Sequence, residues 1–212
     1  KWMLHLNLKA LNAAPMGQFI RQMMDEEAHR GLATLKMMSG IDLTNDVDSL
    51  VMCGKGDAAA GGVMYAYGRF DVQKLTTVAA KAKEYQNKAF GERSLLSWSD
   101  KGKRTNLCFI DPTLAVLSQD EQLVREAVSL IDGKVAGAGA ANAAFGNVLA
   151  HKKARFFALQ ANNMSAFAGQ NPQLQLLKQA EAVMLEVGQA SGANGLDCAL
   201  AMKAANKELA QQ

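Results

Sequence analysis

The residues of this sequence that come closest to a chemical site are two tyrosines, Tyr65 and Tyr67, followed by a basic stretch. They lie two positions apart in the alternating run VMYAYG, so both rings are expected on one face of a β-strand. Aromatic rings on a sheet face bind single-stranded nucleic acids by stacking on their bases. Because GGVMYAYGRF lacks the RNP1 signature, such binding is an alternative hypothesis here. The basic side chains of the stretch are Lys74, Lys81, Lys83, Lys88, Arg93, Lys101, Lys103 and Arg104.

A metal or phosphate site finds little support in the residue spacing. Glu26 and His29 have the Glu-x-x-His spacing of di-iron helical bundles, which need two such pairs. The other histidines, His5 and His151, have no acidic residue three positions earlier. The glycines at positions 54 and 56 lack the GxxxxGK[ST] spacing of a phosphate-binding loop. We therefore predict no metal site and no cofactor.

Nucleophilic catalysis needs a serine or cysteine beside a positioned base. The sequence has no GxSxG motif, and Cys53, Cys108 and Cys198 are far apart in apolar strand patterns, where buried and inert thiols are expected. We predict no catalytic residue. An enzyme or small-ligand carrier with a site between two halves of the chain is a second alternative, because the fold would have to assemble such a site.

Composition restricts the classes of protein further. The 212 residues are 49% hydrophobic and 20% charged, as in ordinary globular proteins, and a net charge of +3 gives no support for general polyanion binding. The longest expected helix, residues 15–38, carries charges throughout and cannot cross a membrane. We predict no membrane span.

Apolar spacing and turn residues divide the chain into alternating strands and helices. Gly40 and Gly133 are expected to end helices, and Asp71 and Asp120 to begin them. Strands are expected at 2–9, 50–53, 62–67, 94–99 and 105–110, and helices at 15–38, from 71 and 120–131.

A similar pattern returns near the C-terminus. Residues 62–67 can be laid over 195–200 at an offset of 133, which matches Tyr65 with Cys198, and residues 3–8 over 156–161 at an offset of 153. Each unit then reads strand, helix, strand, strand, helix, which is most of the ferredoxin-like motif. We predict an α+β fold of two ferredoxin-like (βαββα-type) repeats packed together, with a mostly antiparallel sheet. Residues 1–135 form the first repeat, with an extra hairpin and helix, and 136–212 the second and shorter one.

Three motifs carry a resemblance to a protein family. GIDLTNDVDSLVMCG precedes and enters a strand, GGVMYAYGRFD leads to a helix, and DPTLAVLSQDEQLVREAVSLIDGK reads as a strand and a helix. In this order they resemble a group of uncharacterised bacterial exported α+β proteins of unknown function. The resemblance implies an extracytoplasmic location, in the periplasm or envelope, and no activity that can be assigned to any residue.

These observations lead to one functional hypothesis. Residues 1–212 show a repeat without a catalytic constellation, and the second unit lacks a last strand, which would leave sheet edges unpaired. We predict a non-enzymatic binding or assembly module of the bacterial periplasm or envelope. Its partner would be an unknown protein or a second copy in a homodimer.

Overall fold

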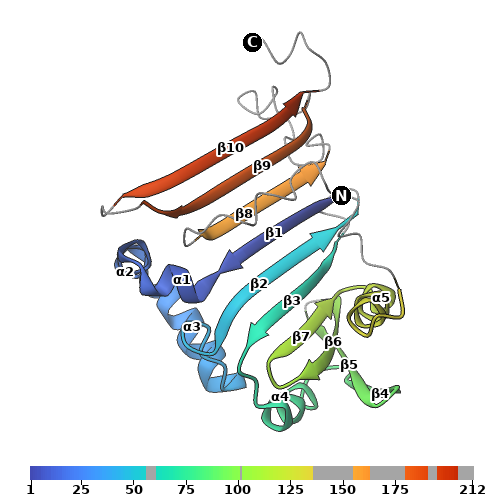
Figure 1. Ribbon diagram of the computed structural model, residues 1–212. Helices are drawn as coiled ribbons and strands as arrows, with labels where there is room; N and C mark the ends of the chain where they lie inside the picture. Colours follow the sequence, from blue (N-terminus) through green and yellow to red (C-terminus); the bar gives the residue numbers. More distant parts are fainter. Residues whose placement is uncertain (56–60, 101, 136–154, 163–179, 191–194, 205–212) are drawn as a thin grey trace.

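The computed structural model describes residues 1–55, 61–100, 102–135, 155–162, 180–190 and 195–204. These residues form an α+β fold around one mostly antiparallel sheet of ten strands (Figure 1). The elements in chain order are β1 (Trp2–Asn7), α1 (Leu8–Ala13), α2 (Pro15–Met23), α3 (Glu26–Ser39), β2 (Val47–Gly54), β3 (Val63–Gly68), α4 (Val72–Ala79), β4 (Gln86–Phe90), β5 (Arg93–Asp100), β6 (Lys103–Asp111), β7 (Leu114–Ser118), α5 (Glu121–Ile131), β8 (Arg155–Asn162), β9 (Ala180–Gln189) and β10 (Leu196–Ala204).

The strand order across the sheet is β10-β9-β8-β1-β2-β3-β7-β6-β5-β4. Strand β1 lies inside the sheet and joins two parts of the chain, because it pairs antiparallel with β2 on one side and β8 on the other. The pair of β1 with β8 runs from Trp2 opposite Ala161 to Leu6 opposite Phe157. Two three-strand meanders, β1-β2-β3 and β8-β9-β10, therefore meet at this pair.

Capping residues set the helix ends where the sequence predicted them. The side chains of Asp71 and Asp120 accept hydrogen bonds from Lys74 N and Gln122 N, at 3.0 and 2.8 Å, and begin α4 and α5. Gly40 follows α3 with a φ of 76°, a left-handed conformation that glycine adopts without strain. These predicted helix ends are confirmed.

The single helix predicted over 15–38 is wrong in one respect. The chain forms α2 and α3 with a break between them, where Met24 is extended with a ψ of 132°. Asp25 then starts α3, because its carboxylate accepts a hydrogen bond from Ala28 N at 2.8 Å. The apolar spacing continues through the break, and a capping aspartate beside further acids decided where one helix ended and the next began.

The predicted ferredoxin-like repeats are not what the described sheet shows. In that motif the strand after the first helix runs parallel to the first strand, with another strand between them, whereas here β2 is the antiparallel neighbour of β1. The predicted helices of the second unit, near Pro172 and after Ala204, lie outside the described residues, as does the boundary at 135/136. The domain division therefore stays a prediction.

The offset of 133 also fails at the level of side chains. Reading across the ladder, Tyr65 lies opposite Val51, Val51 opposite His5, and the same row reaches Ala199 on β10. Cys198 is next to Ala199 in the chain, so it points to the other face of the sheet. The alignment matched two alternating strands with their faces exchanged, which alternation alone cannot detect.

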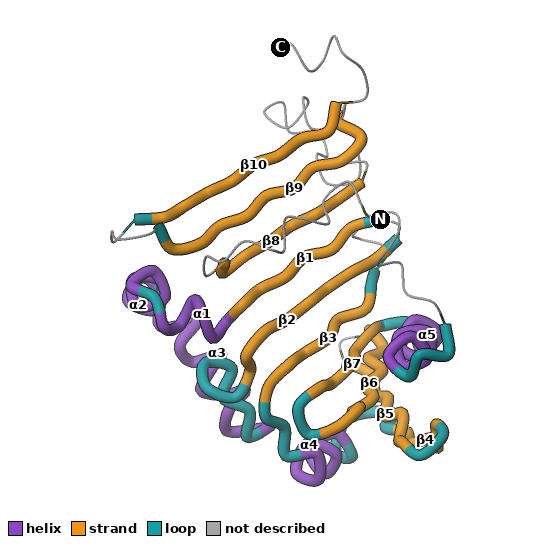
Figure 2. The backbone as a smooth tube through the Cα atoms, viewed as in Figure 1, coloured by secondary structure: helices purple, strands orange, loops and turns teal. Residues whose placement is uncertain are grey.

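The sheet has two faces with different coverings. On the face that α5 covers, called the α5 face, Leu95, Cys108 and Val116 pack against Val124 and Val128 of that helix. The opposite face, called the α4 face, carries a second core with Leu96, Leu107, Ala115 and Phe70, against which Leu75 of α4 packs. Figure 2 shows the described helices grouped around β1 to β7, with none lying over β9 or β10.

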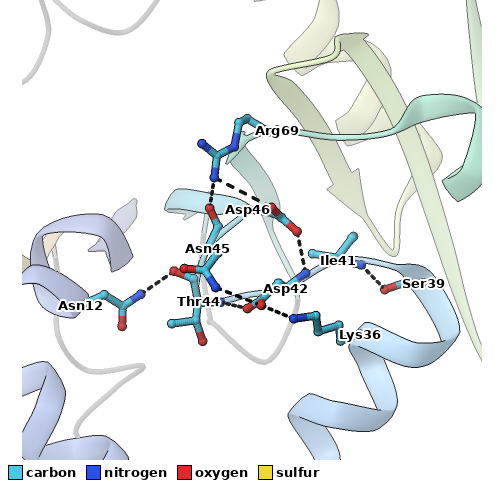
Figure 3. A network of polar contacts seen from close by, with 9 residues as sticks. All are labelled: Asn12, Lys36, Ser39, Ile41, Asp42, Thr44, Asn45, Asp46 and Arg69. Carbon is cyan, nitrogen blue, oxygen red and sulfur yellow. Dashed lines mark hydrogen bonds and ion pairs between the residues drawn. The ribbon is translucent and has the colours of Figure 1, made fainter.

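A polar network ties the loop after α3 to its neighbours (Figure 3). The Asp42 carboxylate accepts hydrogen bonds from Lys36 Nζ at 2.7 Å and from Thr44 N and Asn45 Nδ2 at 3.0 Å. Asp46 Oδ2 accepts from Asp42 N at 2.8 Å, and Arg69 donates to the carbonyl of Asn45. Hydrogen bonds to the charged form favour it, above all the one from Lys36, so the pKa of Asp42 falls from 3.8 to about 2.

We predict that Asp42 makes the free energy of unfolding dependent on acid pH. Its folded pKa is depressed, so its contribution is present above pH 3.8, the unfolded value, and is lost as pH falls towards 2. Asp42→Asn should flatten the pH dependence of urea unfolding over that range. Asp48→Asn is the control, because Asp48 lies 3.8 Å from Lys9 Nζ in an exposed pair, and it should keep the wild-type slope. Equal slopes for wild type and D42N would contradict the prediction.

Candidate functional site

The strongest candidate for a functional site is an apolar surface on the α4 face of β1, β8, β9 and β10. Three rows cross these four strands, and each row contains one directly paired residue from every strand. We call this the open apolar surface. Its rows are Leu6, Phe157, Val187 and Cys198; Leu4, Leu159, Leu185 and Leu200; and Trp2, Ala161, Val183 and Met202.

The side chains of the open apolar surface differ in burial from one strand to another. Trp2, Ala161 and Val183 are buried in one cluster. Leu4, Leu159 and Leu185 are half-buried. On β10, by contrast, Leu200 is 57% and Met202 53% exposed. Large contiguous patches of exposed apolar side chains are unusual on soluble monomeric proteins, and they often mark interaction sites.

The opposite, α5 face of the same strands carries charged side chains beside buried apolar ones, among them Ala182 and Met184. Asp197 and Lys203 point to the α5 face of β10, while Leu200 and Met202 point to the α4 face. Glu186 of β9 lies on the α5 face between Ala158 and Ala199. On β10 the charged and the apolar side chains therefore point to opposite faces, and none of the described helices lies over the apolar side.

Ion pairs of Arg155 on the α5 face connect β8 with β9 and β10. Arg155 Nε lies 3.1 Å from Glu186 Oε2, and Arg155 Nη1 lies 3.3 Å from Asp197 Oδ2. The Glu186 side chain is only 2% exposed. Burying a charged group costs free energy unless an opposite charge lies beside it, and Arg155 lies within ion-pair distance of Glu186.

The tyrosines of the nucleic-acid alternative lie in different surroundings. Tyr65 is half-buried against the core under α5, and burial raises its pKa to about 12. Tyr67, at the end of β3, is 41% exposed. Of the basic residues, Lys88 pairs with Glu121 at 3.0 Å and Arg93 with Asp132 at 2.9 Å. Tyr65 therefore offers less ring surface for base stacking than the sequence pattern predicted. Binding of single-stranded nucleic acid stays an untested prediction.

One imidazole and two thiols, those of His5, Cys53 and Cys108, have pKa values shifted in the direction that favours their neutral forms. Burial lowers the pKa of His5 and raises that of Cys53 and of Cys108. A thiol whose pKa is raised is a poor nucleophile at neutral pH. Cys108 is buried, Cys53 is half-buried and Cys198 is exposed on β10, so the prediction of three buried thiols is confirmed for Cys108 and wrong for Cys198.

A hollow of about 410 Å³ lies between the start of α4 and the strands β5 and β6. Its wall includes Val72, Leu96 and Phe109, with Arg93 and Asp111 among its polar members. All of its lining residues belong to the segment 72–112, so it is not a site between two halves of the chain. Arg93 already donates two hydrogen bonds to Asp132, at 2.9 and 3.1 Å.

The described residues provide neither a metal-binding cluster nor a membrane-spanning helix. They contain no cluster of three or more His, Cys, Asp or Glu side chains that could hold a metal ion. None of the described helices is long and apolar enough to cross a membrane.

Sequence reasoning missed both the open apolar surface and the ion pair. One signal was present: AVMLEVG places a single acid, Glu186, inside an apolar strand, which is a sign of a buried, paired charge. The partner Arg155 starts another strand, and only the pairing of β8 with β9 brings them together.

The fold and this surface define a class: an α+β protein with one long antiparallel sheet whose terminal strands have an apolar face open to solvent. Two solved structures share the fold, crystal forms IV and I of TP0453, a treponemal envelope protein. The first matches at a TM-score of 0.56 and 10% identity over 95% of this chain and 75% of TP0453, the second at 0.53 and 10% over 97% and 75%. No family model and no curated protein matches the sequence.

We predict that removing Arg155 destabilises the protein by about 3 kcal/mol, because Glu186 would be left as an uncompensated buried charge. Arg155→Met should lower the free energy of urea unfolding by that amount, and Arg155→Met with Glu186→Met should recover most of it. The control is Lys9→Met, which breaks an exposed pair and should cost less than about 1 kcal/mol. A double variant no more stable than R155M would contradict this account.

Proposed function

We propose that this chain is a non-enzymatic binding or assembly module of the bacterial envelope, and that the open apolar surface is where its partner binds. The observation that carries the proposal is the three apolar rows, whose members are buried or half-buried on β1, β8 and β9 and exposed on β10. Burying such a surface against an apolar partner would stabilise a complex by about 25 cal/mol for each Å² removed from water.

The form of the surface favours a partner over a small substrate. The rows lie on four neighbouring strands and present aliphatic, aromatic and sulfur-containing side chains without an ionisable group other than the Cys198 thiol. Small-molecule sites are usually concave and carry a few converging polar groups. The charged side chains of Glu186 and Asp197 point to the opposite face.

The envelope location is supported by the likeness of the fold to TP0453 and by the resemblance of the motifs to exported bacterial proteins. Fractionating cells that make the full-length protein tests this part. Recovery from the cytoplasmic fraction would contradict it.

We predict that an apolar probe will protect the Cys198 thiol, which lies on the open apolar surface. The dye 1-anilinonaphthalene-8-sulfonate should slow maleimide labelling of Cys198, measured by peptide mapping. Leu200→Glu with Met202→Glu should abolish this protection. Both side chains are more than half exposed, so the fold should be retained, as circular dichroism would show.

Leu130→Glu is the matched control, because Leu130 is an exposed leucine on α5, 40% accessible and away from this surface. It should leave the protection of Cys198 unchanged. Labelling of Cys198 at the same rate with and without dye in the wild type would count against the proposed binding surface.

A further inference from the structure

Strand β10 forms one of the two edges of the ten-stranded sheet. On its inner side β10 pairs with β9 from Leu196 opposite Gln189 to Ala204 opposite Ala180. In the described part of the chain, no strand pairs with its other side. An edge strand of nine residues presents a row of backbone N–H and C=O groups that favours the addition of another strand.

We infer that β10 pairs antiparallel with β10 of a second copy, so that two sheets become continuous across a two-fold axis. This inference rests on the proposed function and names the partner for the assembly half of it. Closed two-fold dimers are the commonest homo-oligomers, and each places one surface against itself.

The geometry of an antiparallel pair restricts the register. Directly opposed residues point to the same face, and a two-fold axis perpendicular to the sheet keeps each face on its own side. Residues of one face must therefore oppose residues of the same face, and allowed registers differ by steps of two. The register centred on Leu200 is the one that pairs every residue of β10, from Leu196 to Ala204.

In this register the two charges of β10 complement each other. Asp197 lies opposite Lys203 of the second copy, and because of the symmetry the pair occurs twice. Within one copy, Asp197 contacts Arg155 at 3.3 Å and Lys203 contacts Glu181 at 2.7 Å. Across the axis the charges thus alternate in sign from Arg155 to Asp197, then to Lys203 and Glu181 of the second copy.

The apolar side of β10 is complementary in the same register. Leu200 would lie against Leu200 of the second copy, and Cys198 against Met202. All three side chains are exposed in the single chain. Pairing would remove part of this area from water and would make the open apolar surfaces of the two copies continuous, so the dimer would present a doubled binding surface.

The opposite edge of the sheet shows what a protected edge looks like. Strand β4 has only five residues, QNKAF, and four of them are exposed. Pairing two copies of β4 about its centre would set Lys88 against Lys88, and like charges directly opposite each other are destabilising. A lysine on a short edge strand is a common protection against pairing, whereas β10 balances its lysine with Asp197.

Charge reversal tests the inference on the full chain. Sedimentation of the wild type should give twice the mass of the 22.7 kDa chain. Lys203→Asp and Asp197→Lys should each weaken dimerisation roughly tenfold or more, because each sets two like-charged pairs across the axis. An equimolar mixture of the K203D and D197K chains should form heterodimers, because opposite charges then meet at both positions.

Lys9→Asp is the control: Lys9 is an exposed lysine with an ion pair of its own, and K9D should dimerise like the wild type. A second measurement fixes the register. Leu200→Cys in a C198S background should form an intermolecular disulfide on oxidation, because position 200 faces itself across the axis and neighbouring strands bring Cα atoms within disulfide range.

A monomeric wild type would overturn the inference, as would unchanged dimerisation of both charge variants or a mixture that stays monomeric. Failure of the proposed function is separable from these outcomes. A monomer whose Cys198 is still protected by the dye would overturn the pairing alone, and a charge-dependent dimer whose Cys198 is not protected would overturn the apolar binding surface alone.

Discussion

The pairing of β1 with β8 is the interaction on which the rest of the structure depends. It joins the first strand of the chain to a strand that begins at Arg155, and it turns two meanders into one sheet. Without it, β8 would lose its pairing with β1, and the buried cluster that joins Trp2 to Ala161 and Val183 would be broken. The pairing has to offset the conformational entropy that is lost when two segments far apart in the sequence are brought together. Burial of Trp2 and Ala161 at the junction contributes to this.

This junction also divides the sheet into two kinds of surface. From β3 to β5, α5 covers one face and α4 packs against the other, and the cores on the two sides include fully buried leucines and valines. From β1 to β10, the α5 face holds the ion pairs of Arg155 beside a buried apolar cluster, and the α4 face carries the open apolar surface. That surface is incomplete at β10, because Leu200 and Met202 are apolar side chains that are more than half exposed.

The likeness to TP0453 bears on the fold, since 10% identity leaves the side chains free to differ. One backbone arrangement can support unrelated functions, so the function of this chain depends on the side chains at its own surface. Among the described residues, Arg155 and Glu186 are paired, and burial raises the pKa of Cys53 and of Tyr65. Exposed apolar side chains on β10 and its unpaired strand edge are features of binding.

The sequence by itself determined the local structure. Asp71 and Asp120 began helices and Gly40 ended one, because caps act through hydrogen bonds to residues two to four positions away. Strand positions followed from alternation for the same reason. Tertiary structure decided which faces were covered and which strands were neighbours: it set Ala199 and not Cys198 in the row of Tyr65, exposed Leu200, and brought Arg155 to Glu186. Alternation specifies that a strand has two faces, and only pairing with distant segments specifies what each face meets.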